Sequence, residues 1–195
     1  METTKKKLRA RPIIKKIYKE IKEEIVSKSI EPHLKIIVLG EDPAAAYYVN
    51  SIVKKGKKTG INVSVDRLSD NLPQKEMEDL IIKYNNDSSI NGIMIQKPLP
   101  KQINDEKIVN LLDPKKDVDG LHPLNLGYLV LDKEGFVPCT PGAVLEILDF
   151  YDIETSGKNV VVIGRSDIVG KPMANLLLRK NKVGNSTVTV CHSRT

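Results

Sequence analysis

Short apolar runs alternate with amphipathic stretches along this chain, and no other feature constrains the fold as strongly. Residues 34–39 (LKIIVL) predict a buried strand, residues 61–67 alternate as a strand does, and residues 92–96 are again apolar. Two segments with helical periodicity lie between them, the first running from Pro43 to Gly60, with Asp42 as its N-cap, and the second from Glu76 to Tyr84. This order predicts a parallel α/β layer.

A second unit of the same kind begins near residue 160. Residues 160–163 and 187–191 predict strands, residues 169–180 predict a helix between them, and a helix over 142–151 bridges the two units. We therefore predict an α/β protein with one domain over residues 1–140 and part of a Rossmann-like domain over residues 141–195. A nucleotide-binding half needs at least βαβαβ, so we expect more of this second domain beyond Thr195.

The basic charge is concentrated near the N-terminus. The net charge is +6, but residues 1–22 hold nine Lys and Arg against two Glu, so the rest of the chain sums to −1. We interpret this as the polar face of a helix over 10–28 preceded by a solvated arm; an arm that docks on a partner or touches RNA is the alternative. With no Trp and two Phe, we expect no aromatic platform for nucleic acid.

Composition excludes several classes of protein. A chain with 40% hydrophobic and 29% charged residues is neither disordered nor collagen-like. Two cysteines, without a CxxC pair, are too few for a disulfide scaffold, so we expect a reducing, cytoplasmic compartment. No apolar run approaches the ~18 residues of a membrane span, and no apolar segment follows the Lys-rich N-terminus as in a secretory signal.

Residues 97–141 lack clear periodicity and contain six prolines. We expect an irregular segment there, and such a segment inside a compact protein is usually functional.

A glycine turn follows the strand at 160–163. Gly164, Arg165 and Ser166 precede a helix whose free N–H groups could bind phosphate, although the spacing to Gly170 departs from GxGxxG. A glycine turn without a ligand, as in any α/β protein, is the alternative. No Asp or Glu follows the strand at 187–191, where NAD-binding sites place an acid that hydrogen-bonds the ribose 2′-OH. Ser193 and Arg194 follow instead, which favours NADP over NAD.

Three candidate substrate residues lie in the N-terminal unit. Gln96 ends a strand at the carboxyl edge where open α/β sheets bind ligands, Tyr48 lies on the helix over 43–60, and Asp119 lies in the irregular segment. Taken singly, each has an ordinary structural role as the alternative: Tyr48 as core filler, Gln96 as a strand cap and Asp119 as a turn residue.

Together the motifs resemble the bifunctional methylenetetrahydrofolate dehydrogenase/cyclohydrolase (FolD) family. The similarity covers almost the whole chain in order. It rests on residues 40–44 with Tyr48 and Val49, and on residues 96–100 (QKPLP), 116–120 (KDVDG), 138–141 (PCTP) and 164–172 (GRSDIVGKP).

The resemblance implies a catalytic N-terminal domain, an NADP-binding domain, a tetrahydrofolate substrate held in the cleft between them, and a homodimer. It implies that Tyr48 stacks on the folate and that Asp119 holds the pterin. It implies that Gln96 bonds a catalytic lysine four residues after the tyrosine, that Gly164, Arg165 and Ser166 bind NADP, and that Ser193 and Arg194 lie near its 2′-phosphate.

One position departs from the family pattern. Ile52 stands where the resemblance places the lysine, and Ala45 stands where serine is common. Hydride transfer needs two oriented ligands and no side-chain base, whereas hydrolysis of the methenyl product needs an acid–base group. We therefore predict oxidation of methylenetetrahydrofolate with weakened or absent cyclohydrolase activity. Two alternatives stay open: full bifunctional activity with Lys55 or water substituting, and a catalytically silent binder of folate or nucleotide.

We expect no metal. Asp117 and Asp119 lack a third ligand at useful spacing, and the three histidines are scattered. Cys139 and Cys191 have no neighbouring base in the sequence, so we expect both thiols to be unreactive.

Overall fold

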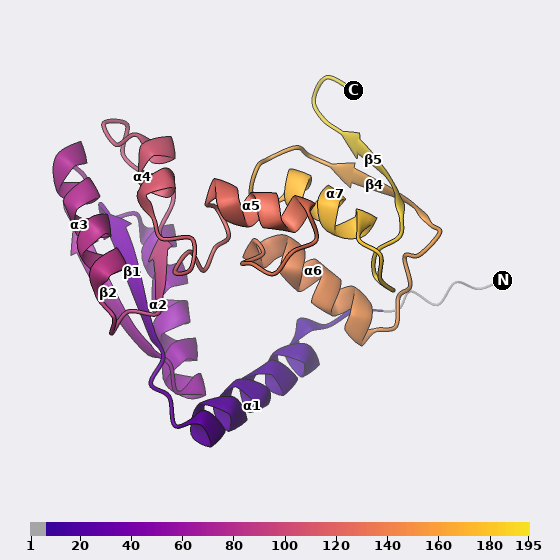
Figure 1. Cartoon of the computed structure of the whole chain (residues 1–195), viewed down its shortest axis with the longest axis horizontal. Helices are drawn as coiled ribbons and strands as arrows, with labels where there is room; N and C mark the ends of the chain where they lie inside the picture. Colours follow the sequence, from indigo (N-terminus) through magenta and orange to yellow (C-terminus); the bar gives the residue numbers. More distant parts are fainter. Residues whose placement is uncertain (1–6) are drawn as a thin grey trace.

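A three-stranded parallel sheet is the centre of the N-terminal unit in the computed structural model, which describes residues 7–195 (Figure 1). Strand β1 (His33–Leu39) lies between β2 (Asn62–Leu68) and β3 (Gly92–Ile95). The register runs from His33 opposite Asn62 to Leu39 opposite Leu68, and Leu34 lies opposite Gly92. The predicted parallel layer is confirmed, and the carboxyl ends of its strands meet at one edge.

Helices cover both faces of this sheet. On one face α2 (Pro43–Thr59) packs Val49 against Ile36 and Val38 of β1. On the other, α3 (Gln74–Asn86) and α4 (Asp105–Leu111) pack against Ile37. Because β1 is buried on both faces, its sequence is a continuous apolar run and does not alternate.

The start of α2 follows the prediction. The Asp42 carboxylate accepts a hydrogen bond from Ala45 N at 2.8 Å, and Pro43 occupies the first helical position, where no N–H is needed. This cap fixes the direction in which α2 leaves the sheet edge and so places Tyr48.

The second unit contains two parallel strands with one helix between them, and the two helices that precede β4 in the chain pack on that helix. Strand β4 (Asn159–Ile163) pairs with β5 (Thr187–Cys191), and α7 (Gly170–Leu178) connects them. Helices α5 (Pro123–Val130) and α6 (Cys139–Phe150) pack on α7, which carries most of the buried side chains of this unit. The outer face of β4 is open: Val161 is 60% exposed and Ile163 is 87% exposed.

The prediction of an irregular segment over residues 97–141 was wrong. Residues 97–141 contain α4, α5 and the first turn of α6. Helix α6 begins three residues before the helix predicted over 142–151. Asn104 caps α4 by accepting from Lys107 N at 2.9 Å, and His122 Nδ1 accepts from Leu124 N at 3.0 Å at the start of α5. Helices of seven and eight residues carry little periodicity, and prolines in a first turn do not break a helix.

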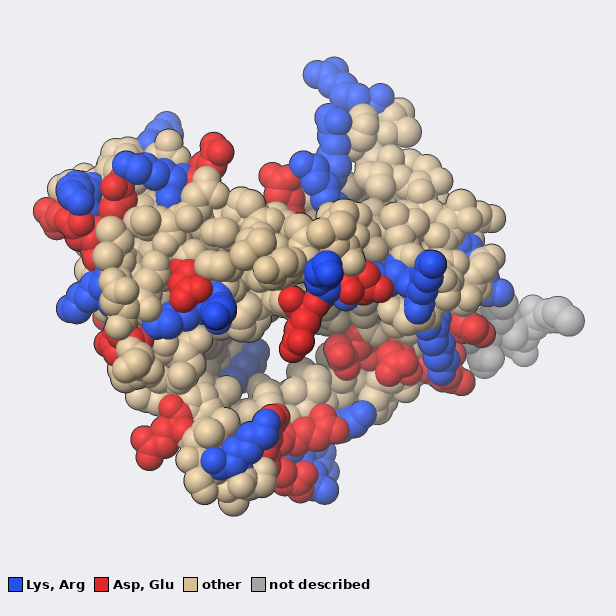
Figure 2. Space-filling model, in the orientation of Figure 1, with Lys and Arg blue, Asp and Glu red and all other residues tan. Residues whose placement is uncertain are grey.

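Helix α1 (Ala10–Lys28) spans the two units. It packs on α2 and also contacts α6, and Arg9 N donates to the Tyr151 hydroxyl at 2.8 Å. Its lysines alternate with glutamates on exposed turns, including an ion pair between Lys16 and Glu20 at 3.9 Å, and Figure 2 shows both signs of charge interspersed on this helix. The described part of the basic segment is therefore the polar face of a helix; Lys5 and Lys6 lie outside the described residues.

No helix within residues 7–195 is both long enough and apolar enough to cross a membrane.

Candidate active site

The structure brings the three predicted substrate residues into one hollow. Tyr48 of α2, Gln96 at the end of β3 and Asp119 line a space of about 190 Å³. Ile168 and Val169, which follow the glycine turn of the second unit, close the same space. The hollow therefore lies between the two units, at the carboxyl edge of the three-stranded sheet, where open α/β sheets bind ligands.

Gln96 lines this hollow and carries an acceptor that no described group uses. Its backbone N–H continues the sheet by donating to Ile37 O at 2.9 Å, and its side-chain Nε2 donates to Lys97 O at 2.8 Å. The Oε1 atom is buried and has no hydrogen-bond partner within the part of the chain that the structure describes. A buried carbonyl oxygen without a donor is costly, so this atom is suited to a ligand that donates.

The loop that carries Asp119 is held by its neighbour Asp117. The Asp117 side chain is 1% exposed and accepts from His122 N at 2.8 Å and from Asn125 Nδ2 at 2.9 Å. Asp117 is thus a structural residue. Within residues 7–195 no three His, Cys, Asp or Glu side chains are grouped to hold a metal.

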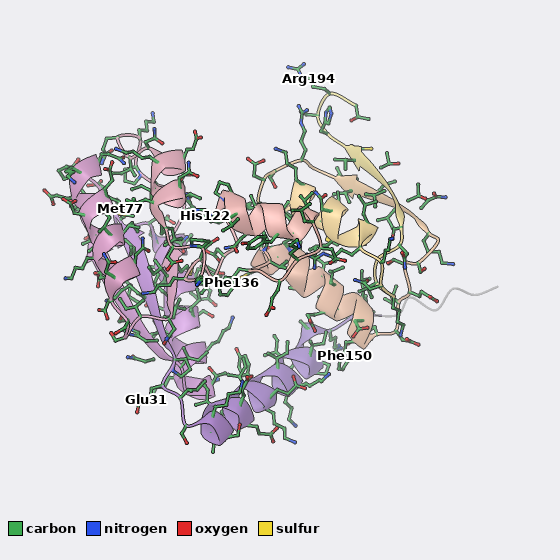
Figure 3. All side chains as sticks on the ribbon, in the orientation of Figure 1. Glu31, Met77, His122, Phe136, Phe150 and Arg194 are labelled. Carbon is green, nitrogen blue, oxygen red and sulfur yellow. The ribbon has the colours of Figure 1, made fainter. Side chains whose placement is uncertain are left out.

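Gly120 brings the start of α6 against Asp119. Its φ is +63°, and a Cβ there would lie 2.8 Å from Phe136 O and 2.9 Å from Pro138 N. Only glycine allows both this backbone conformation and this close approach. Figure 3 shows Phe136 and His122 between the two units, on the segments that carry these contacts.

Asp119 lies in an electrostatically mixed environment. Burial raises the pKa of its carboxyl group, and Asp117 adds to this effect. The Cys139 thiol, which donates to Asp119 Oδ1 at 3.6 Å, and the Lys97 ammonium group both oppose it. Burial and the carboxylate of Asp119 in turn raise the pKa of Cys139 to about 11, so this thiol stays protonated at neutral pH. Burial also raises the pKa of Tyr48.

Lys97 is a residue of the hollow that the sequence reasoning did not single out. It lines the hollow beside Gln96, and its buried Nζ forms an ion pair with Asp105 of α4. Burial lowers the pKa of Lys97 and the negative charge of Asp119 partly offsets this. Its position directly after Gln96 in the sequence was the signal that could have marked it as a candidate site residue.

Ile52 and Lys55 face a different part of the molecule. Ile52 packs against the cluster of Ile36, Val38, Val49 and Met94 and lines a separate hollow of about 210 Å³ toward α1. Lys55 lines that second hollow and not the one that holds Gln96.

The glycine turn is shaped by its own residues. Ser166 Oγ accepts hydrogen bonds from Val169 N at 3.2 Å and Gly170 N at 3.3 Å, at the start of helix α7. Gly164 has a φ of +127°, and a Cβ on Gly170 would lie 2.2 Å from Gly164 O. The backbone therefore folds back on itself in a way that only glycine permits at these positions.

The remaining predicted cofactor residues lie along the same edge of β4 and β5. Gly164 N donates to Cys191 O at 2.8 Å, which places the glycine turn beside the segment that contains Ser193 and Arg194. Arg165, Ser193 and Arg194 are exposed, and Figure 3 shows Arg194 directed away from the body of the protein. None of these residues lines the hollow of Tyr48; Ile168 and Val169 make that connection.

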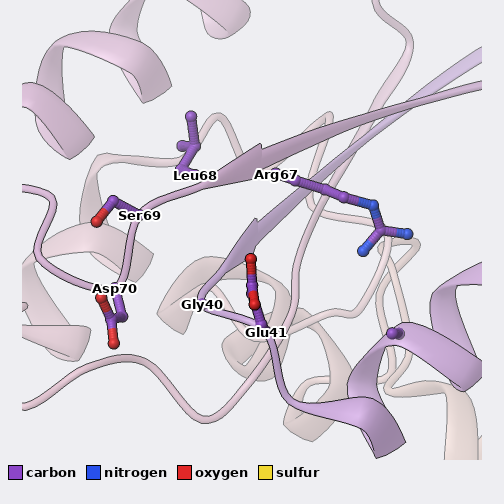
Figure 4. A pocket seen from close by; sticks show the side chains of 7 residues that line it. Gly40, Glu41, Arg67, Leu68, Ser69 and Asp70 are labelled. Atoms are coloured by element: carbon purple, nitrogen blue, oxygen red, sulfur yellow. The ribbon is translucent and has the colours of Figure 1, made fainter.

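A larger hollow lies at the ends of β1 and β2. It measures about 700 Å³ and is lined by residues that include Gly40, Glu41, Arg67 and Asp70 (Figure 4). Arg67 is directed away from Asp70 in this view and donates to Asn50 Oδ1 at 3.1 Å. It contains none of the predicted site residues.

Two family descriptions match the two parts of this chain. Residues 8–119 match the catalytic domain of tetrahydrofolate dehydrogenase/cyclohydrolase, and residues 138–195 match its NAD(P)-binding domain. The chain belongs to the tetrahydrofolate dehydrogenase/cyclohydrolase (FolD) family. The resemblance found in the sequence is thereby confirmed, as is the mixed α/β class.

Individual relatives agree with this assignment. The bifunctional protein FolD of Chlorobium luteolum is 48% identical over 193 residues, which cover 93% of this chain and 65% of that protein. The crystal structure of FolD from Campylobacter jejuni has a TM-score of 0.87 at 44% identity, covering 94% of this chain and 64% of that one. FolD from Trypanosoma brucei, solved in complex with NADP cofactor and inhibitor, has a TM-score of 0.87 at 35% identity over 95% of this chain and 64% of its own. The chain spans 60% to 65% of the first curated relatives it matches.

Proposed function

We propose that this protein oxidises 5,10-methylenetetrahydrofolate to 5,10-methenyltetrahydrofolate with NADP in one-carbon metabolism. The observation that carries the proposal is the hollow in which Tyr48, Gln96 and Asp119 meet Ile168 and Val169 of the glycine turn. A folate held by the first three residues would present its one-carbon group to a nucleotide held by the second unit. Bringing two ligands into contact is the main requirement of hydride transfer.

The residues of the second unit fit a dinucleotide phosphate. A Cβ on Gly164 would meet nothing within 4 Å, so a ligand can approach the backbone there, and the hydrogen bonds from Val169 N and Gly170 N to Ser166 Oγ fix the start of α7 beside it. Arg165 and Arg194 are exposed guanidinium groups suited to the 2′-phosphate, and Ser193 adds a hydroxyl. When bound, NADP supplies the hydride acceptor. The relative from Trypanosoma brucei was solved in complex with NADP, which supports NADP as the cofactor here.

The residues of the hollow bind and orient the folate. We assign the exposed ring of Tyr48 to stacking and the carboxylate of Asp119 to accepting hydrogen bonds from the pterin. We assign Gln96 Oε1 to accepting a further hydrogen bond from the ligand. We further propose that residues 1–140 form the catalytic domain, that residues 141–195 belong to the cofactor domain, and that the protein works as a cytoplasmic homodimer. Light scattering during size-exclusion chromatography measures that oligomeric state.

Hydrolysis of the methenyl product needs a group that moves protons. With Ile52 in place of the expected lysine, we propose that hydrolysis is slower than oxidation. The packing of Ile52 into the β1 cluster and the position of Lys55 beside it, away from Gln96, support this ranking and disfavour Lys55 as a substitute.

One assay tests the proposal. The protein is mixed with methylenetetrahydrofolate and NADP, and the absorbance of the methenyl product is followed over time. We expect the signal to rise and then decay slowly. Folate binding without a rise in the signal would contradict the proposal and favour the silent binder; decay as fast as formation would contradict the ranking of the two steps.

A further inference from the structure

Lys97 is the one cationic side chain among the described residues that line the hollow of Tyr48, Gln96 and Asp119. It comes from the end of β3, directly after Gln96, so the buried strand fixes its backbone. Its side chain is 29% exposed and its Nζ atom is buried. A lysine seldom lies in such a place unless it is paired or functional, because burying an ammonium group costs free energy.

Several charged or titratable groups surround this ammonium group. Asp105 at the start of α4 forms an ion pair with it. Tyr48, Asp119 and Cys139 line the hollow with it, and Lys101, Glu106 and Asp167 line the adjoining groove of about 830 Å³ that Lys97 also reaches. Burial lowers the pKa of Lys97 and so favours the neutral amine, whereas the Asp119 carboxylate favours the ammonium form, so the lysine can exchange a proton more readily than an exposed one.

We propose that Lys97 is the general acid–base group for hydrolysis of the methenyl product, at a position other than residue 52. This inference rests on the proposed function. In the reaction, the oxygen of water bonds to the one-carbon carbon while the neutral amine of Lys97 takes a proton from that water. The bond from this carbon to N5 then breaks, its electron pair stays on N5, and the ammonium group of Lys97 returns a proton to N5. As the bond to N5 breaks, the hydroxyl oxygen on this carbon loses its proton to solvent and becomes the carbonyl oxygen of the formyl group, so the starting cation and one water give the ring-opened formyl folate and one proton.

The other groups of the hollow are less suited to this task. The pKa of Cys139 is raised to about 11 and that of Tyr48 is raised as well, so both keep their protons at neutral pH. Asp119 is assigned to the pterin, and Lys55 lies in the hollow toward α1. Lys97 is therefore the group of this hollow that combines position with an exchangeable proton.

The test supplies methenyltetrahydrofolate directly, so that hydrolysis is read without the oxidation step. We expect the protein to hydrolyse it faster than buffer alone, and Lys97→Met to lower kcat for hydrolysis about 10²-fold, within the range of general acid–base catalysis. Lys55→Met, which removes a lysine from the other hollow, is the matched control and should change the rate less than twofold. The oxidation assay, run in parallel, reports whether the proposed function itself holds.

The dependence of the rate on pH separates proton transfer from simple electrostatics. With the uncatalysed rate subtracted, hydrolysis by the protein should rise with pH through a midpoint below the usual lysine pKa. Asp105→Asn should move this midpoint to lower pH, because it removes the carboxylate that is paired with the ammonium group. Lys97→Arg keeps the charge but cannot exchange the proton, so it should lose the pH-dependent limb as Lys97→Met does.

Two results would overturn the inference. One is hydrolysis by the unmodified protein no faster than buffer, with oxidation intact. The other is a Lys97→Met or Lys97→Arg protein that is folded by circular dichroism and keeps both the rate, within threefold, and the pH profile.

Discussion

The glycine turn after β4 and the hollow at the end of β3 are built in different ways. The turn is one contiguous segment, Gly164 to Gly170, whose shape follows from two glycines and the Ser166 hydroxyl. The hollow draws its side chains from α2, β3, the loop at Asp119 and the start of α6. A site made of one segment depends on local backbone geometry, whereas a site made of several depends on the packing that brings them together. Substitutions should therefore affect the two regions differently.

The largest effect is expected where the hollow depends on packing. Asp117→Ala leaves His122 N and the Asn125 amide without their buried acceptor. We expect the free energy of unfolding to fall by about 3 kcal/mol, measured by urea denaturation. Asp113→Ala, which removes an exposed acceptor of Lys115 N in the same segment, is the control and should cost less than 1 kcal/mol. Equal losses for the two variants would contradict the structural role of Asp117.

The next effect concerns the backbone of the turn. Gly170→Ala places a Cβ 2.2 Å from Gly164 O, so the turn must open. We expect affinity for NADP, measured by calorimetric titration, to fall about 10²-fold, the cost of misplacing groups by about 1 Å. Gly127→Ala, where a Cβ meets nothing within 4 Å, is the matched control and should bind NADP normally. Unchanged binding by Gly170→Ala would show that the turn does not hold the nucleotide.

Asp119 should couple folate binding to pH. Because burial raises its pKa, Asp119 takes up a proton at less acid pH than an ordinary carboxyl group. Folate affinity should therefore weaken as the pH falls through this raised pKa. Asp119→Asn should bind folate ten- to a hundredfold more weakly at pH 7, with no such pH dependence; binding can be followed by fluorescence. A wild-type affinity that is constant down to the usual carboxyl range would contradict the assignment.

The same substitution should weaken folate binding but stabilise the folded protein at pH 7. A raised pKa in the folded state means that the ionised carboxylate costs stability above the pKa of the unfolded chain. Asp119→Asn should therefore raise the melting temperature at pH 7, and the gain should vanish as the wild-type carboxyl group becomes protonated at acid pH. A lower melting temperature at pH 7 would indicate that Asp119 stabilises the fold, as Asp117 does.

The smallest effect concerns the hydroxyl of the turn. Ser166→Ala removes the acceptor of two backbone N–H groups, those of the exposed Val169 and the buried Gly170. We expect the affinity for NADP, measured by titration, to fall roughly fivefold, which corresponds to about 1 kcal/mol. Ser166→Thr, which keeps the hydroxyl, should recover most of it.

Much of the fold could be predicted because it is encoded locally. The apolar run of β1, the helix start at Asp42 and Pro43, and the glycine turn are each contained in one short segment of the sequence. Helices α4 and α5 were missed because their caps, Asn104 and His122, precede segments too short to show periodicity. Tyr48, Gln96 and Asp119 could be chosen through the resemblance. The pairing of Asp119 with Cys139 and the burial of Lys97 could not, because these contacts join segments far apart in the sequence and depend on Gly120 and Asp105.

Together, the hollow and the turn would hold two ligands in contact for hydride transfer. The most direct measurement uses methylenetetrahydrofolate with two deuterium atoms on its one-carbon group, incubated with the protein and NADP. Mass spectrometry of the reduced cofactor should find one deuterium, transferred from the folate. Reduced cofactor without deuterium, or no reduced cofactor while both ligands bind, would contradict the account.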